Sequence, residues 1–443
     1  MTERPYWNAA METIAPAALA DHEDRLVSAA VRDVWERSPF YQRKLDGAGL
    51  APGAVRGVRD LGLVPFSTKA ELRASQEARP PFGDYTAVPV RDIVRVHKTS
   101  GSTGRPLYIA LTRRDVAATQ ECAARAFWAA GLRPGHVVVH CLNYCLWTGG
   151  VTDHLILEAA GATVIPFGVG NTRELIRTIR ALGATAISCT PSYPALLEKL
   201  LAEDGGPAPR ELGLELALFG GEGGLDNAEF RRRLEEVWGF RVRNANYGLS
   251  EVISILGGQC EVTNDLHFHA GDAIFAELLE PETGRRLPIR EGAVGELVAT
   301  HLRKECQPLI RYRTRDVLTV TGTGPCQCGR SSWRFRVTGR TDDMFKVRGV
   351  NVFPSAVRAV IADQPALSTG HFRIQLAGPG PYDRIELTVE AATALPVERW
   401  NDAARSIETA IKLRLAAGAQ VRMVAPESLP RTAGKTSWIE RSP

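Results

Sequence analysis

Two short segments contain the residue types best suited to phosphate chemistry. The first, Thr99–Pro106, combines hydroxyl side chains and glycines with one arginine, and the second, Pro430–Lys435, places a single lysine in a turn near the end of the sequence. Glycines let a backbone approach phosphate oxygens closely, while N–H groups, hydroxyls and an arginine donate hydrogen bonds to them. The Gly-x4-Gly-Lys-Ser/Thr spacing of a Walker A motif is absent. The first segment therefore predicts phosphate binding of another kind; the alternative for such a loop in isolation is a plain surface turn.

The composition is that of a soluble globular protein, not of a disordered or fibrous one. The sequence has 443 residues, of which 54 are basic and 50 acidic, and this small excess argues against a nucleic-acid or membrane-surface protein. Met1–Trp7 lacks the layout of a signal peptide, and no apolar run reaches the roughly 20 residues of a membrane helix. The 8 cysteines in so long a chain do not indicate a disulfide framework, so we expect a cytoplasmic protein.

Short β-rich runs alternate with helical patterns through the middle of the sequence. A first helix is predicted from His22 to about Phe40. After the glycine-rich loop, four β-rich runs each precede a helix: Val137–Val139 before Val151–Ala160, Thr163–Ile165 before Thr172–Leu182, Ala186–Ser188 before Pro194–Leu201, and Leu216–Phe219 before Asn227–Trp238. This alternation predicts βαβ units on a largely parallel sheet. Ligands are then expected in the loops at the carboxyl ends of those strands.

The pattern changes beyond Asp265, where antiparallel runs such as Ala273–Leu279 and Val294–Thr300 are predicted. A further break at Gly339–Asp343 precedes a small α+β region, with a helix from Pro354, strands at His371–Leu376 and Arg384–Val389, a helix over Val397–Leu415 and a strand at Gln420–Val424. We therefore expect an α/β fold with two domains. The large one, residues 1–341, holds the parallel sheets and a β-rich subdomain, and the small one comprises residues 342–443.

A series of motifs follows in a fixed order: Pro39–Leu45, Val64–Lys69, Pro81–Gly83, Thr99–Pro106, Thr148–Gly150, Gly161–Pro166, Cys189–Tyr193, Arg311–Asp316, Gly349–Ser355 and Pro430–Lys435. In this order the sequence resembles the phenylacetate–coenzyme A ligases, a branch of the adenylate-forming superfamily. The resemblance implies that ATP and an aryl carboxylate give an acyl-adenylate, from which the thiol of coenzyme A displaces AMP. Alternative acceptors are a carrier-protein thiol or an amine. An alternative of another class is a nucleotide-binding regulator or zinc-dependent interaction module without turnover.

The resemblance also assigns a nucleotide site. Glu251, which ends the motif Tyr247–Glu251, corresponds to the family's Mg²⁺ ligand, a task that suits a carboxylate. Asp316 corresponds to the carboxylate that accepts from both ribose hydroxyls, and Arg340 to its partner on the ribose and phosphate side. The expected nucleotide-binding residues are Ser100, Gly101, Ser102, Thr103, Gly104, Arg105, Gly221, Glu222, Asn246, Tyr247, Gly248, Ser250, Asp316 and Arg340.

Lys435 is the expected catalytic cation, together with Glu251. Joining a carboxylate to the α-phosphate of ATP brings two anions together, and a flexible ammonium in a dehydrated site stabilises the accumulating charge. By resemblance, Asp342 is the hinge about which the small domain swings after adenylation, and Gly349 then approaches the coenzyme A channel. A terminal lysine without such a context would simply be solvated. The resemblance also suggests a homodimer.

A candidate structural zinc site comes from Cys326 and Cys328, a Cys-x-Cys turn tighter than the usual Cys-x2-Cys knuckle. Cys260, with His267 or His269, completes a tetrahedral set, and in a strand over Leu266–His269 both histidines face the same side, so the choice between them stays open. Related ligases share the Cys-x-Cys-Gly-Arg signature. The alternative is a group of reduced thiols without metal.

The expected acid-binding residues are Tyr144, Trp147, Thr148, Gly149, Phe219 and Tyr247. Tyr144 and Trp147 supply aromatic walls, but Asn143, Cys145 and Leu146 are bulkier or more polar than the family pattern. A smaller or polar-substituted aryl acid, such as a hydroxy- or aminobenzoate, suits this loop better than phenylacetate. Two further departures are Arg105 in place of the usual lysine and Arg358 in place of an acidic residue.

Overall fold

A computed structural model describes residues 5–99, 106–348, 350–378, 380, 382–430 and 438–442. The chain divides into two compact units. The first is drawn from the segments 1–221, 234–314 and 319–336, and the second from 222–233, 315–318 and 337–443. The α/β class and the division into parallel, antiparallel and C-terminal α+β parts are confirmed. The hinge at Asp342 and its movement stay predictions.

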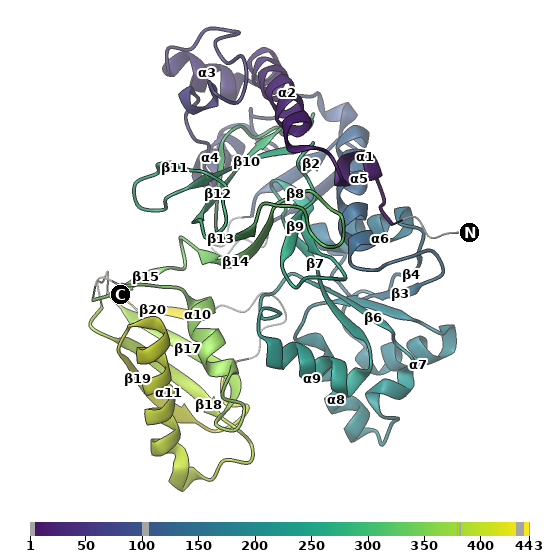
Figure 1. The fold of residues 1–443 in the computed structure, drawn as a ribbon, viewed down its shortest axis with the longest axis vertical. Coiled ribbons are helices and arrows are strands. Elements are labelled where there is room, and N and C mark those ends of the chain that lie inside the picture. Colours follow the sequence, from purple (N-terminus) through teal and green to yellow (C-terminus); the bar gives the residue numbers. More distant parts are fainter. Residues whose placement is uncertain are drawn as a thin grey trace. The chain divides into compact units, whose positions relative to one another are not determined.

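Parallel strands form the centre of the first unit. β3 (Val137–His140) pairs in parallel with β4 (Thr163–Ile165) and β5 (Ala186–Cys189), and the ladder continues through β6 (Leu216–Gly220) to β7 (Arg241–Leu249). The helices between and before them are α5 (Arg113–Ala129), α6 (Thr148–Ala159), α7 (Thr172–Leu182), α8 (Tyr193–Glu203) and α9 (Ala228–Trp238). In Figure 1 these strands lie in the blue-to-teal part of the ribbon, with α7 and α8 against one another beside them.

The sheet continues beyond β7 with antiparallel strands. β8 (Ile253–Gln259) pairs with β7 and with β9 (Leu266–Phe268), and β10 (Ile274–Leu279) pairs with β11 (Arg286–Leu287) and β12 (Val294–His301). With β13 (Tyr312–Gly322) and β14 (Arg334–Arg340) the order in this 12-stranded sheet is β11-β10-β12-β13-β14-β9-β8-β7-β6-β5-β3-β4. A separate hairpin joins β1 (Arg95–Lys98) to β2 (Tyr108–Leu111).

The core of the first unit lies between α5, α6 and the sheet. It contains fully buried Phe127 and Leu132 within and after α5, Ile156 and Leu157 of α6, and sheet residues such as Val138, Leu216 and Ile255. Both α4 (Lys69–Ala78) and α5 begin with a capping box, formed by Thr68 with Glu71 and by Thr112 with Asp115. Such reciprocal bonds satisfy the free N–H groups of the first turn, so the residue that precedes each helix also fixes where it starts.

The N-terminal helices differ from prediction in one respect. The expected helix from His22 to Phe40 is two helices, α2 (Pro16–Arg37) and α3 (Pro39–Gly47), after a short α1 (Ala9–Glu12). Ser38 has extended backbone angles and caps the N-terminus of α3, because its side-chain oxygen accepts a hydrogen bond from the backbone N–H of Tyr41. Pro39 takes the first position of this helix. Because proline lacks an N–H and disfavours a helical residue before it, the chain turns at this point. Single turns of 3-10 helix lie at Leu61–Leu63, Val90–Asp92, Pro209–Leu212 and Val397–Arg399.

The second unit has its own sheet and core. Its strand order is β19-β18-β17-β20, formed by Ala419–Val424, Ile385–Ala391, Ser368–Ala377 and Ile439–Ser442, and α10 (Pro354–Ala362) and α11 (Trp400–Leu415) complete the unit with the hairpin of β15 (Phe345–Val347) and β16 (Val350–Val352). Val357, Ile374, Leu387 and Ile407 are fully or almost fully buried between helices and sheet. Strand β20 was not predicted. None of the described helices is long and apolar enough to cross a membrane.

Candidate active site

The predicted acid-binding residues of the first unit all lie near the carboxyl ends of its parallel strands. Tyr144 and Trp147 lie in the loop after β3, Thr148 and Gly149 open α6, Phe219 lies near the end of β6, and Tyr247 lies near the end of β7. Carboxyl ends of neighbouring parallel strands share one edge of a sheet, which is where ligands bind in open α/β folds. The side chains of the predicted residues do not all meet, however: Phe219 is fully buried against Phe240, at 6.0 Å between ring centroids, and Tyr247 packs against Phe335, at 5.4 Å.

Glycines allow unusually close packing at this edge. A Cβ atom on Gly150 would lie 2.3 Å from the carbonyl oxygen of Asn143, and one on Gly248 would lie 2.0 Å from the carbonyl oxygen of Ser254. A Cβ on Gly220 would lie 2.4 Å from the Cβ of Asn246. Because real side chains never come so near, these three positions require glycine for the loops to meet as they do.

A buried polar cluster, which we call the Asp153 cluster, links α6 to the β7–β8 hairpin. It consists of Asp153, Asn246 and Ser254. Asp153 is fully buried, Ser254 Oγ donates to its Oδ1 at 2.7 Å, and the amide of Asn246 donates to its Oδ2. Burial raises the pKa of Asp153 to about 7, and the two hydrogen bonds only partly oppose that effect.

A second group of polar side chains lies beside the loop after β3. The hydroxyl of Tyr144 is 2.9 Å from Nδ1 of His154, whose Nε2 is 3.0 Å from Oε1 of Glu158. His140 bonds Ser188 Oγ at 3.1 Å and the carbonyl of Gly150 at 2.9 Å, and burial lowers the pKa of His140 to about 4. Tyr144 is thus held by hydrogen bonding as well as by packing, and this wall of the predicted acid site is polar.

Thr148 has an unusual environment for a buried hydroxyl. Its Oγ1 is buried without a hydrogen-bond partner among the described residues, and the residue lines a cavity together with Ser250, Ser254, His301 and Lys304. A buried hydroxyl without a partner loses free energy unless a ligand or water completes its bonding. The predicted substrate role of Thr148 gains support from this feature.

Glu251 lies in a basic pocket of the first unit. Its Oε1 is 2.5 Å from Nζ of Lys69 and 3.5 Å from the hydroxyl of Tyr312, and Lys304 Nζ donates to its backbone carbonyl at 2.9 Å. Burial lowers the pKa of Lys304, and nearby carboxylates partly offset this. The ammonium of Lys69 therefore neutralises Glu251 at the position where a Mg²⁺ ion is predicted, and an oxygen ligand at this buried site fits such a hard cation.

Sequence reasoning missed Lys69 as a functional residue. It belongs to the motif Val64–Lys69 and takes the first position of α4, directly after its capping residue Thr68. The motif marked the family, but no spacing in the sequence joins Lys69 to Glu251.

The predicted ribose residues meet in the second unit. Arg340 forms an ion pair with Asp316, which is buried, and a two-pronged pair with Asp342 at 2.9 and 3.0 Å. Burial acts to lower the pKa of Arg340, but Asp316 and Asp342 outweigh it and raise the pKa overall. The expected hinge residue is therefore tied to the expected ribose partner. Glu222 also lies in this unit, near Arg358, whose Nη1 donates to the carbonyl of Gly223 at 2.5 Å.

Several predicted residues lie outside the described part of the chain. They are Ser100, Gly101, Ser102, Thr103, Gly104 and Arg105 of the phosphate loop, Gly349 of the coenzyme A channel and the catalytic Lys435. Their roles stay predictions.

Two family models match the chain. Residues 42–301 match the AMP-binding enzyme family and residues 349–440 match the AMP-binding enzyme C-terminal domain. A phenylacetate-coenzyme A ligase of Thermus thermophilus is 38% identical over 384 residues, 86% of this chain and 83% of that protein. One of Pseudomonas putida is 33% identical over 97% of this chain and 95% of its own.

The chain belongs to the phenylacetate–coenzyme A ligase family of AMP-binding enzymes. Among solved structures, a 2-hydroxyisobutyryl-CoA ligase in complex with its acyl-adenylate is 30% identical, with a TM-score of 0.89, and the match covers 100% of this chain and 93% of that one. The named acids of these relatives, one aromatic and one a small hydroxy acid, differ widely, so family membership does not identify the acid.

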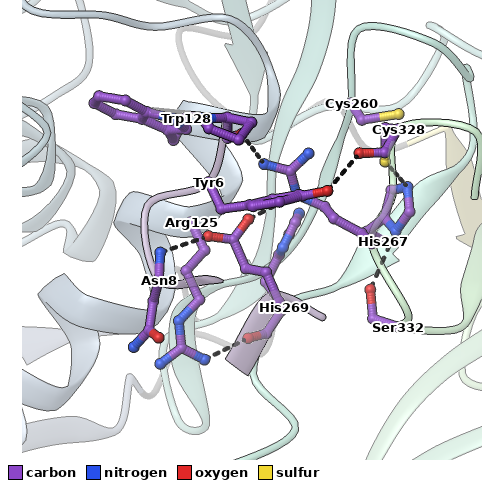
Figure 2. Close-up of polar contacts among 12 residues, drawn as sticks. Tyr6, Asn8, Arg125, Trp128, Cys260, His267, His269, Cys328 and Ser332 are labelled. Carbon is purple, nitrogen blue, oxygen red and sulfur yellow. Dashed lines mark hydrogen bonds and ion pairs between the residues drawn. The ribbon is translucent and has the colours of Figure 1, made fainter. Parts of the chain in front are cut away.

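This family member also has a cluster of four potential metal ligands, which we call the cysteine–histidine cluster. It consists of Cys260, His267, Cys326 and Cys328, whose ligand atoms all lie within 4.8 Å of one another. His267 Nε2 is 3.7 Å from the sulfur of Cys328, and its Nδ1 is 3.1 Å from Ser332 Oγ (Figure 2). Three sulfurs and one imidazole form a donor set that fits tetrahedral zinc, and a hydrogen bond on the second ring nitrogen is typical of a zinc-bound histidine.

The structure distinguishes the two histidines that the sequence left open. Strand β9 ends at Phe268, and the buried His269 bonds the carbonyl of Gly258 through Nε2 at 3.1 Å instead of joining the sulfurs. The backbone N–H groups of Val262 and Thr263 both donate to the sulfur of Cys260 at 3.4 Å. A hydrogen bond from the Cys260 thiol lowers the pKa of Cys328 and raises that of Cys260.

The N-terminal segment packs on this cluster. Tyr6 donates to the carbonyl of Cys328 at 3.4 Å, as Figure 2 shows, and Glu12 forms a buried ion pair with Arg330 at 2.7 Å. Ser331 donates its N–H to the carbonyl of Glu12 at 3.0 Å. Gly329 has a positive φ of 83°, and a Cβ there would lie 2.0 Å from the Tyr6 hydroxyl. The turn that holds two of the cysteines is thus also the surface that anchors residues 6–12.

Proposed function

We propose that this protein joins an aromatic carboxylic acid to coenzyme A at the expense of ATP. As a member of its family the chain is an AMP-forming acid–thiol ligase. In the first step a carboxylate oxygen attacks the α-phosphorus, the bond to the β-phosphate breaks, and pyrophosphate leaves. In the second step the thiol sulfur attacks the acyl carbon, and AMP leaves with the electron pair of the broken bond. The observation that carries the proposal is the buried hydroxyl of Thr148, which has no hydrogen-bond partner among the described residues and lies in a cavity that Ser254 and Lys304 also line.

The residue roles follow from position and chemistry. Glu251 would hold a Mg²⁺ ion, which would supply positive charge to the nucleotide phosphates, and Lys69, 2.5 Å from that carboxylate, adds positive charge beside it. Asp316 accepts from the ribose hydroxyls and is positioned by Arg340. Thr148 supplies its unpartnered hydroxyl to the acid. Lys435, on a domain that moves about Asp342, stabilises the charge of the first step only.

The cysteine–histidine cluster binds zinc in this proposal. All four positions are protein side chains, so the site is closed and structural, with no position for a substrate. The metal would fix the turn at Cys326–Arg330 and, through it, the N-terminal segment.

An exchange of labelled pyrophosphate into ATP tests the first step. Each acid of a panel of phenylacetate, benzoate, and hydroxy- and aminobenzoates is supplied in turn, and the reaction is repeated with coenzyme A. We expect acid-dependent exchange that Lys435→Ala reduces by about a thousandfold or more. Lys412→Ala, on the exposed end of α11, is the matched control and leaves exchange unchanged. Exchange that ignores the acid or Lys435 contradicts the proposal.

The acceptor is tested separately. A thioester formed with coenzyme A but with neither a carrier protein nor an amine supports the ligase, whereas a product only with one of the other two supports the alternative acceptors. Phenylacetate as the best acid would contradict the polar acid site expected from Asn143–Trp147. The expected homodimer can be checked by light scattering.

A further inference from the structure

The Asp153 cluster holds a carboxyl group whose two oxygens each accept a hydrogen bond. Asp153 projects from α6, one turn beyond Gly149, and is completely buried. Ser254 Oγ donates to one of its oxygens at 2.7 Å, and the amide nitrogen of Asn246 donates to the other. In this arrangement each carboxyl oxygen accepts one hydrogen bond, so both partners must turn a donor toward Asp153.

This requirement fixes the orientation of Asn246. Because the NH₂ group points at Asp153, the carbonyl oxygen Oδ1 points away from it. No group in the described part of the chain donates to this Oδ1, and it is not among the buried polar atoms without a partner. Asn246 is itself only half-buried. The structure therefore presents an oriented acceptor at the protein surface.

The neighbours of Asn246 show which side this acceptor faces. Asn246 lies beside Gly220 across the β6–β7 ladder, and the pair is so close that a Cβ on Gly220 would clash with the Cβ of Asn246. A Cβ on Gly149 would lie 3.4 Å from Oδ2 of Asp153. The next residue, Tyr247, packs instead against Phe335, at 5.4 Å between ring centroids. Since successive strand residues point to opposite faces, Asn246 faces α6, where Thr148 and Gly149 lie.

We propose that Asn246 Oδ1 accepts a hydrogen bond from the acid, so that the enzyme selects carboxylic acids that bear an N–H or O–H group near the carboxyl end. Asp153 is the positioning residue that holds the amide in this orientation. The inference rests on the proposed acid activation and specifies its substrate class. It also assigns Asn246 to acid binding, whereas the sequence predicted that this residue binds the nucleotide.

Matched pairs of acids test this selection. The pairs are 2-hydroxybenzoate with 2-methylbenzoate and 2-hydroxyisobutyrate with pivalate, which exchange a hydroxyl for a methyl group of similar size. We expect wild type to prefer one hydroxy acid over its methyl partner by about 10- to 100-fold in kcat/KM, because the methyl leaves Oδ1 unpaired. Asn246→Leu should abolish that preference by lowering kcat/KM for the hydroxy acid, while the methyl acid changes by less than about threefold and the KM for ATP does not change.

Variants of Asp153 separate positioning from simple structural support. Asp153→Ala frees the amide and should reduce the preference as Asn246→Leu does, chiefly through a higher KM for the hydroxy acid. Asp153→Asn keeps an oxygen that accepts from Asn246 and should restore the preference. Lys412→Ala, on the exposed end of α11, is the control, with the preference retained. If Asp153→Ala does not fold, the contrast between Asp153→Asn and Asn246→Leu decides.

The outcomes distinguish the two proposals. If wild type uses both acids of every pair with equal kcat/KM, the inference is wrong, but the proposed activation of the acid is unaffected. A rise in the KM for ATP in Asn246→Leu, equal for all acids, overturns it in favour of a nucleotide contact. No acid-dependent AMP formation with any acid overturns the proposed function itself.

Discussion

The cysteine–histidine cluster and the Asp153 cluster are both buried polar groups that join distant segments of the first unit, yet they differ in what they leave unused. In the cysteine–histidine cluster all four ligand atoms point at one centre, within 4.8 Å of one another, and the second nitrogen of His267 is bonded to Ser332. In the Asp153 cluster both carboxyl oxygens accept a hydrogen bond, but Oδ1 of Asn246 accepts none from the described residues. A closed set can only stabilise the fold, whereas an open one can bind a ligand. Substitutions in the cysteine–histidine cluster should therefore affect stability alone, whereas those in the Asp153 cluster should also affect which acid the enzyme prefers.

Cys328→Ala should have the largest effect. Loss of one of four ligands should remove zinc and lower the free energy of unfolding by about 4 kcal/mol or more, because the remaining thiolates lose their cation. Metal content and the denaturation midpoint measure this. Cys145→Ala, an exposed cysteine outside the cluster, is the control and should change neither. Undiminished stability without metal would contradict a structural zinc site.

Glu12→Gln should be next. The Glu12–Arg330 pair is almost completely buried, with side chains 1% and 5% exposed, so removing the negative charge leaves the arginine uncompensated at a cost of about 3 kcal/mol. Trp7, which packs against Trp128 at 5.7 Å between ring centroids, should change its fluorescence as residues 6–12 detach. Chelation of zinc should give the same signal. Glu36→Gln, on the exposed face of α2, is a suitable control.

Asp153→Ala should cost less, about 2 kcal/mol, because it removes a fully buried partner of two neutral groups instead of a charge partner. Its larger consequence should be on acid selection, unlike any change in the cysteine–histidine cluster. If Cys328→Ala altered acid preference and Asp153→Ala did not, the comparison of a closed and an open cluster would be wrong.

The Asp153 cluster should make the stability depend on pH in a defined direction. The pKa of Asp153 is about 7 in the folded protein, against an ordinary value of 3.8, so the folded state holds this proton more tightly than the unfolded state. Its contribution is complete below about pH 4 and is lost as the pH rises to about 7. The Tm of wild type relative to Asp153→Asn should thus fall by a few degrees over that range and then level off. A flat difference would contradict the raised pKa.

Ser254→Ala should have the smallest effect, about 1 kcal/mol, since one hydrogen bond is lost while Asn246 stays in place. Thermal unfolding measures the cost, and the hydroxy-acid preference should persist. A loss of preference would mean that Asp153 needs both partners to orient the amide.

The sequence predicted the parts of the fold that depend on local patterns. Alternating β-rich runs and helices indicated the parallel sheet, and motifs such as Tyr247–Glu251 indicated the site. By contrast, the spacing of apolar residues predicted one continuous helix from His22 to Phe40, but the structure has two, separated at Ser38. The backbone restriction that Pro39 imposes has a stronger effect here than the helical pattern of apolar residues. The choice of His267 over His269 depended on where β9 ends, which no residue pattern states.

The side-chain pairs that complete the site could not be predicted. Lys69 and Glu251 are joined only when α4 and the β7–β8 hairpin come together, and Asp153 and Asn246 lie 93 positions apart. Neither pair belongs to a periodic pattern, a capping motif or a turn motif that could be recognised in the sequence. Long-range ion pairs and hydrogen bonds of this type appear only after the sheet order is known.

The contact of residues 6–12 with the turn at Cys326–Arg330 has a consequence for synthesis. Glu12 and Arg330 are 318 positions apart, so at about 5–20 residues per second a ribosome needs roughly 15 to 60 s between making the first and the second. Throughout that interval Glu12 lacks its charge partner, and β9 lacks β14, its neighbour in the sheet order. The N-terminal segment can meet Trp128 early in synthesis, but the contacts that seat it on the turn at Cys326–Arg330 form only when nearly three-quarters of the chain has been translated.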